Sequence, residues 1–476
     1  MAKKTTQTQQ AQKPKRNNSQ ITAKDCAHIS FPDSKDDWDA VLQSFIYSFD
    51  QDAVFRFSSK TNQEDIDWEE DPFAYYDYQC RQWLAGRWIG ETTFSCNKNK
   101  KEYQISVAPR FGVESLYPMF EEIFSINILD NKSEQQTKDA NALLQILLPL
   151  IWSQKLGNAN KYGIPRTTVD VLHKGQSVKG RLLVRKSILP FFREQSVVSA
   201  TREKQVDKTI CRIILQAYSI LKKRFGHIRF SNMSDSAINA IENFEAANIP
   251  DKRITSGDYA NIQYKAIYQS WKEVVDFSWR IIQQTMDFSQ KKSDTKRGLS
   301  LFVDMAEIWE MYLRSLLKKR FPDWKVRSVE QSTIFTYNST FFNRNVIPDI
   351  IMERGNDVVV FDAKWKKMTF DKKDVDRSDF FQIHTYIQYF QMLGKNVKAG
   401  GLLYPISKKE ITDNQLNRNH SKNLFGLDAT PTPFVVDGIC FGSEDDANGG
   451  MDVKKYKEYF AERVNEFIGR IGKYLQ

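Results

Sequence analysis

The chain has 476 residues, of which 41% are hydrophobic and 13% aromatic, and its formal net charge is +10. This length exceeds one ordinary hydrophobic core, so two or three domains are expected. The charge permits a polyanionic partner such as nucleic acid, and it equally permits a generic basic surface. Five widely spaced cysteines without a C-x-x-C pair argue against a disulfide framework or a zinc site and favour a reducing cytosol.

The first residues are polar. Residues 1–24 are rich in Gln, Lys, Thr and Asn, and they predict a disordered basic tail that either touches nucleic acid or is simply solvated. They contain no apolar stretch of the kind found in secretory signals. The longest apolar run, LLQILLPLIW at 143–152, is about half a membrane span and predicts a core helix. We therefore expect a cytoplasmic protein without a membrane segment.

Residues 25–290 predict an N-terminal domain that is β-rich to about 130 and then mixed helical. The acidic and aromatic stretch 63–78 is either a protein-docking surface or an ordinary loop. Alternating and helical apolar spacing predicts, in chain order, a hairpin of 87–94 and 102–111, a helix at 138–160, a strand pair within 177–189, and helices at 208–225 and within 259–284.

A polar segment at 287–300 predicts the domain junction, and 296–476 is the expected second domain. It should open with a helix at 301–321, whose apolar face comprises Leu301, Met305, Ile308, Tyr312 and Leu316. Strands, a helix through 378–393, a strand at 399–406 and a helix at 454–474 follow. The expected fold is a multidomain α/β (α+β) protein whose C-terminal domain has a central mixed sheet flanked by helices.

The segment 347–366, IPDIIMERGNDVVVFDAKWK, concentrates charge in an apolar setting. Gly355-Asn356 suits a two-residue type II′ turn between two strands. With that turn, Asp349 faces Asp362 across an antiparallel pair, and the period-two alternation of a strand puts Lys364 on the same face. The register therefore predicts that these two carboxylates and the lysine form one cluster.

Such a cluster suits phosphodiester hydrolysis. Opposed carboxylates repel unless a cation lies between them, and hard oxygen ligands suit Mg²⁺ or Mn²⁺. The ion activates water and a neighbouring lysine stabilises charge developing on the phosphate. The motif is short, and a plain surface ion pair is the alternative. Its apolar strand favours a site, as do Gln382 and Tyr386, which stand four residues apart on the next helix and could face the cluster.

With these residues, the chain resembles the PD-(D/E)xK nuclease superfamily and, within it, the McrC-like subunits of McrBC-type restriction systems. The resemblance extends diffusely over 85–470. It is carried by the PD hairpin, by DAKWK and the QIHTY helix, and more weakly by RWIGETTF, ISVAPRFGVESLYPMF, VKGRLLVRKSI, VDKTICRIILQAYSIL and FVDMAEIWEMYL.

The resemblance implies roles for individual residues. Asp349, Asp362 and the backbone carbonyl of Ala363 would bind Mg²⁺, with Mn²⁺ possible, and Lys364 would be the catalytic lysine. Glu310 would be a helix-borne acid that also reaches the metal.

The resemblance also makes Gln382 and Tyr386 supporting residues of the site, and each could instead cap the core or face solvent. Glu307 lies one turn from Glu310, so either acid, or neither, could face the metal.

The resemblance also implies partners: double-stranded DNA and a McrB-like hexameric AAA+ GTPase, which the N-terminal region would dock on and stimulate. The chain lacks the Walker A motif of such a motor. It departs from the family in its basic tail, in 63–78, and at Arg110 and Trp365, which leaves the docking surface and subtype open. A non-catalytic adaptor of an NTPase and a stand-alone repair nuclease are the alternatives.

Overall fold

The computed structural model divides into two compact units, which are described separately here: unit 1 combines residues 1–144 and 300–476, and unit 2 is 145–299. The residues that the structure describes are 20–32, 35–50, 55–57, 72–124, 140–225, 233–290, 301–327, 335–338, 343–346, 348–368, 375–407, 420–421, 432–442 and 453–476. The division differs from the predicted one, because the β-rich N-terminal part shares a unit with the C-terminal part.

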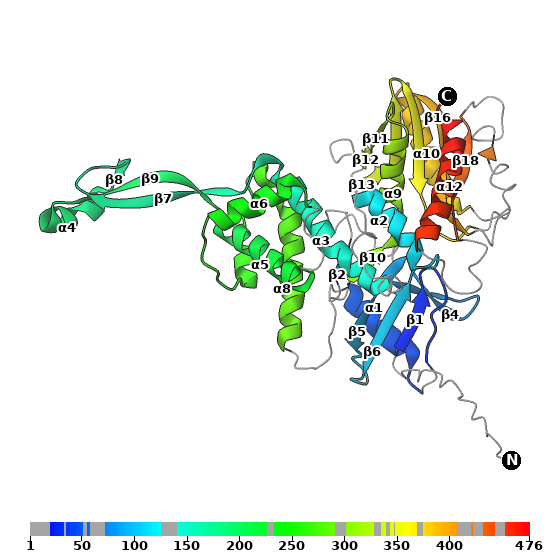
Figure 1. Cartoon of the computed structure of the whole chain (residues 1–476), viewed down its shortest axis with the longest axis horizontal. Coiled ribbons are helices and arrows are strands. Elements are labelled where there is room, and N and C mark those ends of the chain that lie inside the picture. Colours follow the sequence, from blue (N-terminus) through cyan, green and yellow to red (C-terminus); the bar gives the residue numbers. More distant parts are fainter. Residues whose placement is uncertain are drawn as a thin grey trace, which may run out of the picture. The chain divides into compact units, whose positions relative to one another are not determined.

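Unit 1 contains a five-stranded sheet in the order β1-β6-β5-β10-β2. Its strands are β1 (Gln20–Lys24), β2 (Phe55–Phe57), β5 (Trp88–Ser95), β6 (Glu102–Ala108) and β10 (Leu301–Asp304). A hairpin of β3 (Ala74–Asp77) and β4 (Gln82–Ala85) accompanies it. Helix α1 (Trp38–Asp50) packs on this part through Phe45 and Phe49, whose rings contact those of Phe73 and Phe302. Figure 1 shows these elements side by side.

This sheet confirms one prediction and corrects two. The hairpin expected at 87–94 and 102–111 is the antiparallel pair β5–β6. Residues 20–24 are not part of a tail, because β1 pairs in parallel with β6. The helix expected from residue 301 begins only at Met305, because 301–304 form β10 between β5 and β2. The first part of the chain is thereby joined to the second by backbone hydrogen bonds.

Unit 1 also contains a six-stranded mixed sheet in the order β11-β14-β15-β16-β18-β17. Its strands are β11 (Lys325–Arg327), β14 (Ile350–Arg354), β15 (Asp357–Ala363), β16 (Asn396–Ser407), β17 (His420–Ser421) and β18 (Phe434–Phe441). The β15, β16 and β18 strands are parallel, and the other pairings are antiparallel. The strands β12 (Phe335–Asn338) and β13 (Asn343–Val346) form a separate hairpin.

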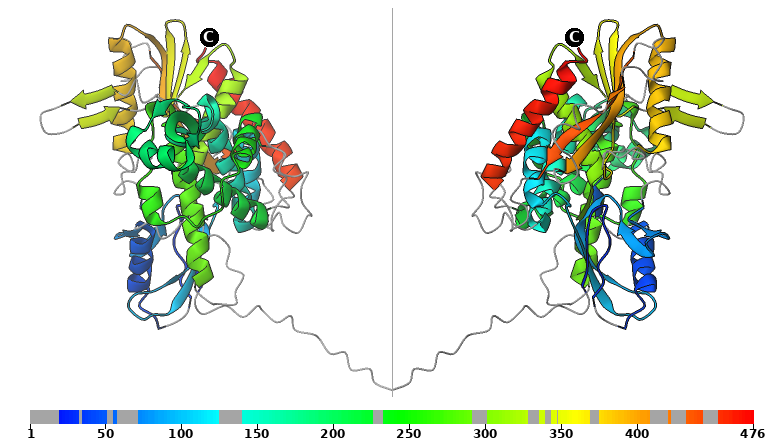
Figure 2. Two further views of the ribbon diagram at one scale, coloured as in Figure 1. Left: turned by 90° about the vertical axis from the view of Figure 1, so that its left-hand side faces the viewer. Right: turned by 90° about the vertical axis from the view of Figure 1, so that its right-hand side faces the viewer.

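Helices flank this mixed sheet, as predicted. They are α2 (Leu116–Phe124), α9 (Met305–Arg320), α10 (Arg377–Met392) and α12 (Val453–Gly472). Figure 2 shows α10 and α12 on different sides of the sheet. Ile383 and Ile387 of α10 pack with Val358 and Val360 of β15 in one core cluster. A Cβ atom at Gly400 would lie 2.2 Å from the Ile387 Cδ1 atom, so glycine lets α10 approach the strands closely.

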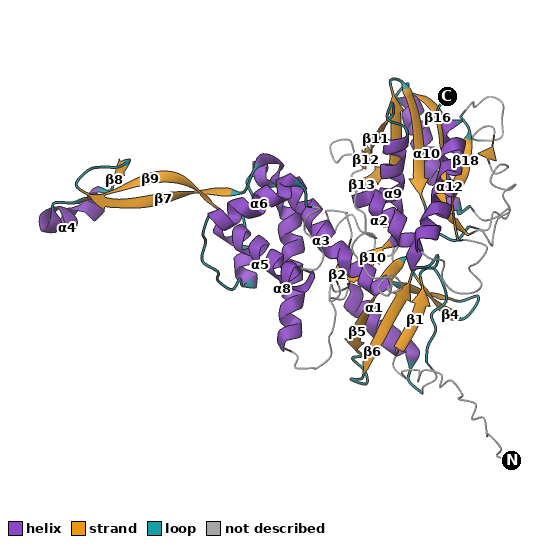
Figure 3. Ribbon diagram, in the orientation of Figure 1, coloured by secondary structure: helices purple, strands orange, loops and turns teal. Residues whose placement is uncertain are grey.

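Unit 2 combines a helical body with an arm (Figure 3). The body consists of α3 (Ala140–Ala159, which begins just before the unit boundary), α5 (Lys208–Phe225), α6 (Asp235–Ala246), α7 (Ser256–Ala260) and α8 (Trp271–Gln290). In its core the Trp152 indole N–H donates to Ser278 Oγ at 2.8 Å. The arm is a long antiparallel ribbon of β7 (Arg166–Gly175) and β9 (Val197–Val206), with β8 (Arg181–Leu182) and helix α4 (Val184–Glu194) at its far end.

Unit 2 confirms the helices expected at 138–160, at 208–225 and within 259–284, and it contradicts one other prediction. The strand pair expected within 177–189 is wrong, because only Arg181–Leu182 is a strand and α4 begins at Val184. The apolar residues Val184, Ile188 and Phe192 have the spacing of a helix. The prediction was based instead on the apolar residues within 177–189, whose short run is also compatible with a strand. The helix expected within 259–284 is α8, which begins at Trp271, after a 3-10 turn at Ala266–Tyr268.

The remaining predictions concern the apolar run, the acidic and aromatic stretch and the N-terminal tail. The apolar run 143–152 lies in α3, where Ile151 and Trp152 are buried, as expected for a core helix. Among the described residues we find no helix with the length and apolar character needed to cross a bilayer. Of the stretch 63–78, residues 63–71 lie outside the described residues, and Ala74–Asp77 form β3. Residues 1–19 of the predicted tail also lie outside them.

Candidate active site

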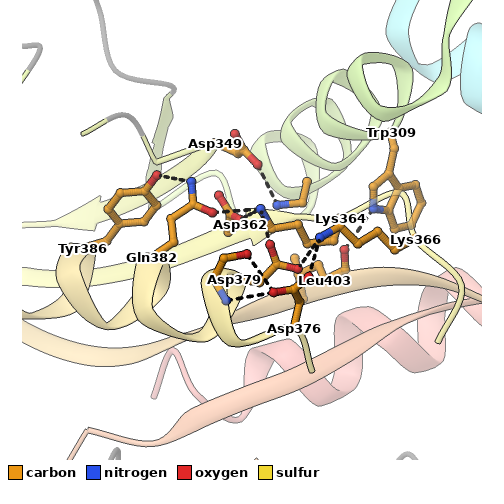
Figure 4. A network of polar contacts seen from close by, with 12 residues as sticks. Trp309, Asp349, Asp362, Lys364, Lys366, Asp376, Asp379, Gln382, Tyr386 and Leu403 are labelled. Atoms are coloured by element: carbon orange, nitrogen blue, oxygen red, sulfur yellow. Dashed lines mark hydrogen bonds and ion pairs between the residues drawn. The ribbon is translucent and has the colours of Figure 1, made fainter. Parts of the chain in front are cut away.

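The hairpin β14–β15 brings Asp349 and Asp362 together. Ile350 pairs with Phe361 and Arg354 with Asp357, so Gly355-Asn356 is the turn, as predicted, and Gly355 has a φ of +63°. Asp349 directly precedes β14, and its Oδ2 accepts a hydrogen bond of 2.8 Å from the backbone N–H of Ala363. Figure 4 shows both carboxylates at the end of the hairpin that lies opposite the turn. The structure therefore has the predicted register.

The environment of the two carboxylates disfavours their charged forms. Burial and then the charge of Asp349 raise the pKa of Asp362 well above its ordinary value. Burial, followed by the charge of Glu310, raises the pKa of Asp349 to about 6, although Lys364 opposes this shift. Two acids crowded in a desolvated site bind a cation favourably, because the cation removes their mutual repulsion.

Lys364 lies among three acceptors. Its ammonium is 2.6 Å from Asp362 Oδ2 and 3.2 Å from Asp379 Oδ1, and it donates to Gln382 Oε1 at 2.9 Å. Burial alone would lower the pKa of Lys364, but the carboxylates of Asp362 and Asp379 raise it above its ordinary value. The lysine is therefore a fixed positive charge beside the two hairpin carboxylates.

Helix α10 brings Gln382 and Tyr386 to the same place. Gln382 accepts from Lys364 and donates through Nε2 to the Tyr386 hydroxyl oxygen at 2.8 Å (Figure 4). Tyr386 is buried, and this burial and the nearby charge of Asp362 raise its pKa, so its hydroxyl stays protonated. The two residues face the cluster, at the spacing that the sequence indicated.

Helix α9 carries Glu310, whose charge is the second cause, after burial, of the raised pKa of Asp349. Glu310 forms an ion pair with Arg314, one turn further along the helix, and Arg314 Nη1 donates to the Asp349 main-chain oxygen at 3.4 Å. Glu307 is buried one turn earlier, with 5% of its surface exposed. Helix α9 thus brings Glu310 into the electrostatic environment of Asp349, and its service as a metal ligand stays a prediction.

The donor set fits a hard divalent cation with few protein ligands. In the described part of the chain, no group of three or more His, Cys, Asp or Glu side chains converges to hold a metal ion. Mg²⁺ is usually bound by one or two carboxylates and several waters, which a facing pair supplies. Asp362 Oδ2 is buried and contacts the Lys364 ammonium at 2.6 Å.

Sequence reasoning missed Asp379, in the first turn of α10. Its side chain is 5% exposed, and its second oxygen contacts the Lys366 ammonium at 2.8 Å. Asp379 is three residues before Gln382, hence on the same face of the helix, and that spacing was the available signal.

Sequence reasoning also missed the contacts of Trp365 with the N-terminal part of the chain. Trp365 follows Lys364, and its indole N–H donates to Asp25 Oδ2 at 2.7 Å. The Arg110 guanidinium lies 4.9 Å from the centre of the Trp365 ring and donates to the Lys366 carbonyl at 3.2 Å. Trp365 and Arg110, two positions at which the chain departs from the family it resembles, are therefore in contact with each other.

A mixed sheet flanked by helices, with Asp349, Asp362 and Lys364 on one hairpin, has the arrangement of a PD-(D/E)xK motif. The family described as "McrBC 5-methylcytosine restriction system component" matches residues 85–405, more than half of the chain. The chain therefore belongs to this family, which confirms the resemblance drawn from the sequence.

Two solved structures from Thermococcus gammatolerans are similar at low identity. One is the refined half-complex from a tetradecameric assembly of McrB AAA+ hexamers with bound McrC, matched at 14% identity over 94% of this chain and 100% of that chain, with a TM-score of 0.42. The other is the cryo-EM structure of the McrBC complex, matched at 14% identity over 64% of this chain and 88% of that chain, with a TM-score of 0.30. No match was found among curated proteins.

Proposed function

We propose that the chain is the nuclease subunit of a McrBC-like restriction complex and that it hydrolyses phosphodiester bonds of double-stranded DNA. The observation that carries the proposal is the facing of Asp349 and Asp362 beside Lys364 on one hairpin. Family membership supplies the restriction context. Paired carboxylates with raised pKa values are costly to keep in a fold, and a cation-dependent reaction gives a reason for them.

The side chains would divide the chemistry among them. Asp349, Asp362 and the Ala363 carbonyl would hold Mg²⁺ or Mn²⁺, with Glu310 as a further acid on the Asp349 side. When bound, such an ion lowers the pKa of a coordinated water and neutralises a phosphate. Lys364 would stabilise the extra charge on the pentacovalent phosphate, because its ammonium is held 2.6 Å from Asp362 Oδ2, beside the proposed metal ligands. Gln382, fixed by Tyr386, would keep the lysine oriented.

The arm of unit 2 supports the proposal of a protein partner, a hexameric AAA+ GTPase. Its end helix α4 exposes large apolar side chains: Phe192 is 82% exposed, Leu189 66% and Val184 63%. Exposed apolar side chains clustered on one short element mark an interaction site. We propose that the partner docks on this end of the arm and is stimulated there. This surface is a small part of the N-terminal region that the sequence analysis assigned to docking.

The test separates cleavage from docking. The full chain and its AAA+ partner are mixed with plasmid DNA, GTP and Mg²⁺, and Asp349→Ala, Asp362→Ala and Lys364→Ala are compared with the wild type. We expect each variant to lose cleavage and to stimulate GTP hydrolysis as the wild type does. Full cleavage by the Asp362→Ala complex would contradict the proposed site. If the wild-type complex does not nick DNA but still stimulates the GTPase, the chain is an adaptor.

A further inference from the structure

Asp379 connects two lysines at the edge of the candidate active site. Its Oδ1 lies 3.2 Å from the Lys364 ammonium and its Oδ2 lies 2.8 Å from the Lys366 ammonium. Its side chain is 5% exposed, whereas that of Lys366 is 49% exposed. A buried carboxylate is costly unless it is paired, and here each oxygen has its own cation.

The contacts of Lys364 show why this pairing matters. A lysine ammonium has three N–H donors, and three acceptors surround this one, namely Asp362, Asp379 and Gln382. Asp362 is at the same time one of the two proposed metal ligands. Where Asp362 turns Oδ2 to an ion, Lys364 loses this acceptor, and the two acceptors on α10 still fix the ammonium.

We infer that Asp379 is a positioning residue that keeps Lys364 in place while Asp362 serves as a metal ligand. This inference rests on the proposed function. Gln382 is neutral, so Asp379 is the anionic partner among the two acceptors that α10 offers, and its negative charge adds an attraction to the ammonium that an amide oxygen lacks. The N–H that Asp362 releases is then free to meet a phosphate oxygen, with the other two donors still anchored.

The start of α10 gives this residue a rigid support. Asp376 is the N-cap, and its side chain accepts a 2.8 Å hydrogen bond from the backbone N–H of Ser378. Asp379 follows in the first helical turn, where the helix dipole favours a carboxylate. The dipole alone would account for an acid at this position, so the test must distinguish a helix-stabilising acid from one that holds Lys364.

The matched pair is Asp379→Asn and Asp376→Asn. Both change an acid of the same helix start, and both acids contact Lys366, at 2.8 Å and 3.6 Å, but Asp379 also contacts Lys364. Asparagine at 376 still caps the helix. Three quantities are measured on the full chain: the rise in melting temperature with Mg²⁺, DNA affinity in Ca²⁺ without cleavage, and kcat and KM for plasmid cleavage with the AAA+ partner.

We expect Asp379→Asn to lose about 10- to 100-fold in kcat, the usual range for a residue that orients a site group. Its KM, its Mg²⁺-induced melting shift and its DNA affinity should stay within about twofold of wild type. Asp376→Asn should resemble wild type in all three, and Asp379→Glu should recover part of the kcat.

Three outcomes overturn the inference while the proposed function stands: a wild-type kcat for Asp379→Asn, a loss that follows weakened Mg²⁺ binding, or an equal loss in Asp376→Asn. A wild-type complex that does not cleave DNA overturns the proposed function itself, and the inference with it.

Discussion

The indole N–H of Trp365 donates to the buried carboxylate of Asp25, 340 positions earlier in the chain, at 2.7 Å. Lys364 and Trp365 directly follow β15, and these neighbours have different partners: Lys364 contacts Asp362 and Asp379, whereas Trp365 contacts Asp25. Asp25 follows β1 of the five-stranded sheet, and its other oxygen accepts from the Arg110 backbone N–H at 2.6 Å. The N-terminal sheet therefore holds the residue next to the proposed catalytic lysine.

This contact predicts a measurable contribution to stability. Trp365→Phe removes the donor and leaves a buried carboxylate oxygen without it, which should lower the free energy of unfolding by about 1–3 kcal/mol. The matched control is Trp83→Phe, which removes an indole hydrogen bond of equal length to the solvent-exposed Asp39 and should cost less than about 1 kcal/mol. Urea denaturation of the full chain measures both. Equal losses for the two variants would refute a special role for the buried contact.

The raised pKa of Asp349 predicts a pH-dependent effect of Mg²⁺ on stability. The folded value of about 6 exceeds the ordinary 3.8, so the metal-free fold binds this proton more tightly than the unfolded chain does. The resulting stability is fully present below about pH 4 and is lost as the pH rises through about 6. An ion that binds the carboxylate should therefore raise the melting temperature more at pH values above 6 than below 4.

The control for this pH dependence is Asp349→Asn, which keeps an acceptor for the Ala363 N–H but does not titrate. This variant should lose most of the rise in melting temperature that Mg²⁺ causes at high pH. Without metal, its melting temperature should depend less on pH between about pH 4 and 6 than that of the wild type. If Mg²⁺ raises the melting temperature of the wild type equally above pH 6 and below pH 4, Asp349 is not a metal ligand with a raised pKa.

The two acids of α9 predict unequal effects on metal binding. Glu310 acts on Asp349 electrostatically, and Glu307, one turn earlier, is not among the main influences on the Asp349 pKa. Glu310→Gln should therefore raise the Mg²⁺ concentration that gives half-maximal cleavage about 10- to 100-fold. Glu307→Gln should change it less than about threefold, with any effect confined to stability. The opposite order would assign the third acid to Glu307.

The exposed end of the arm predicts a change in partner activation. Phe192→Asp should reduce the stimulation of the AAA+ GTPase more than about tenfold, the effect expected of an aromatic interface anchor. The substitution should leave the melting temperature within about 1 °C, since Phe192 is 82% exposed. Ile267, 56% exposed on the body of unit 2, provides the control Ile267→Asp. Equal stimulation by both variants would place the docking surface elsewhere.

The sequence predicted what is local. The hairpin of Asp349 and Asp362 follows from a turn and a two-residue period, and Gln382 and Tyr386 from a helical spacing. Asp379 shares a face of that helix with Gln382, but an acid in the first turn of a helix is common, so the spacing alone did not distinguish it as a site residue. Asp25 and Trp365 meet only through tertiary packing.

Sheet membership was also not predictable from the sequence. Residues 301–304 look like the beginning of the helix that follows, and only their pairing with β5 and β2 makes them a strand. That pairing joins the N-terminal strands to the C-terminal part, and no local feature of the sequence indicated that these two parts share one unit. The prediction for the end of the arm was wrong for a related reason: a short apolar run there is compatible with both a strand and a helix.

The most direct test of the central claim is the location of a bound divalent ion. Crystals of the full chain are soaked in Mn²⁺, and anomalous differences are collected. We predict one strong peak within coordinating distance of the carboxylates of both Asp349 and Asp362, which disappears in Asp362→Asn. A peak elsewhere, or none at the hairpin in wild-type crystals saturated with Mn²⁺, would contradict the proposed metal site.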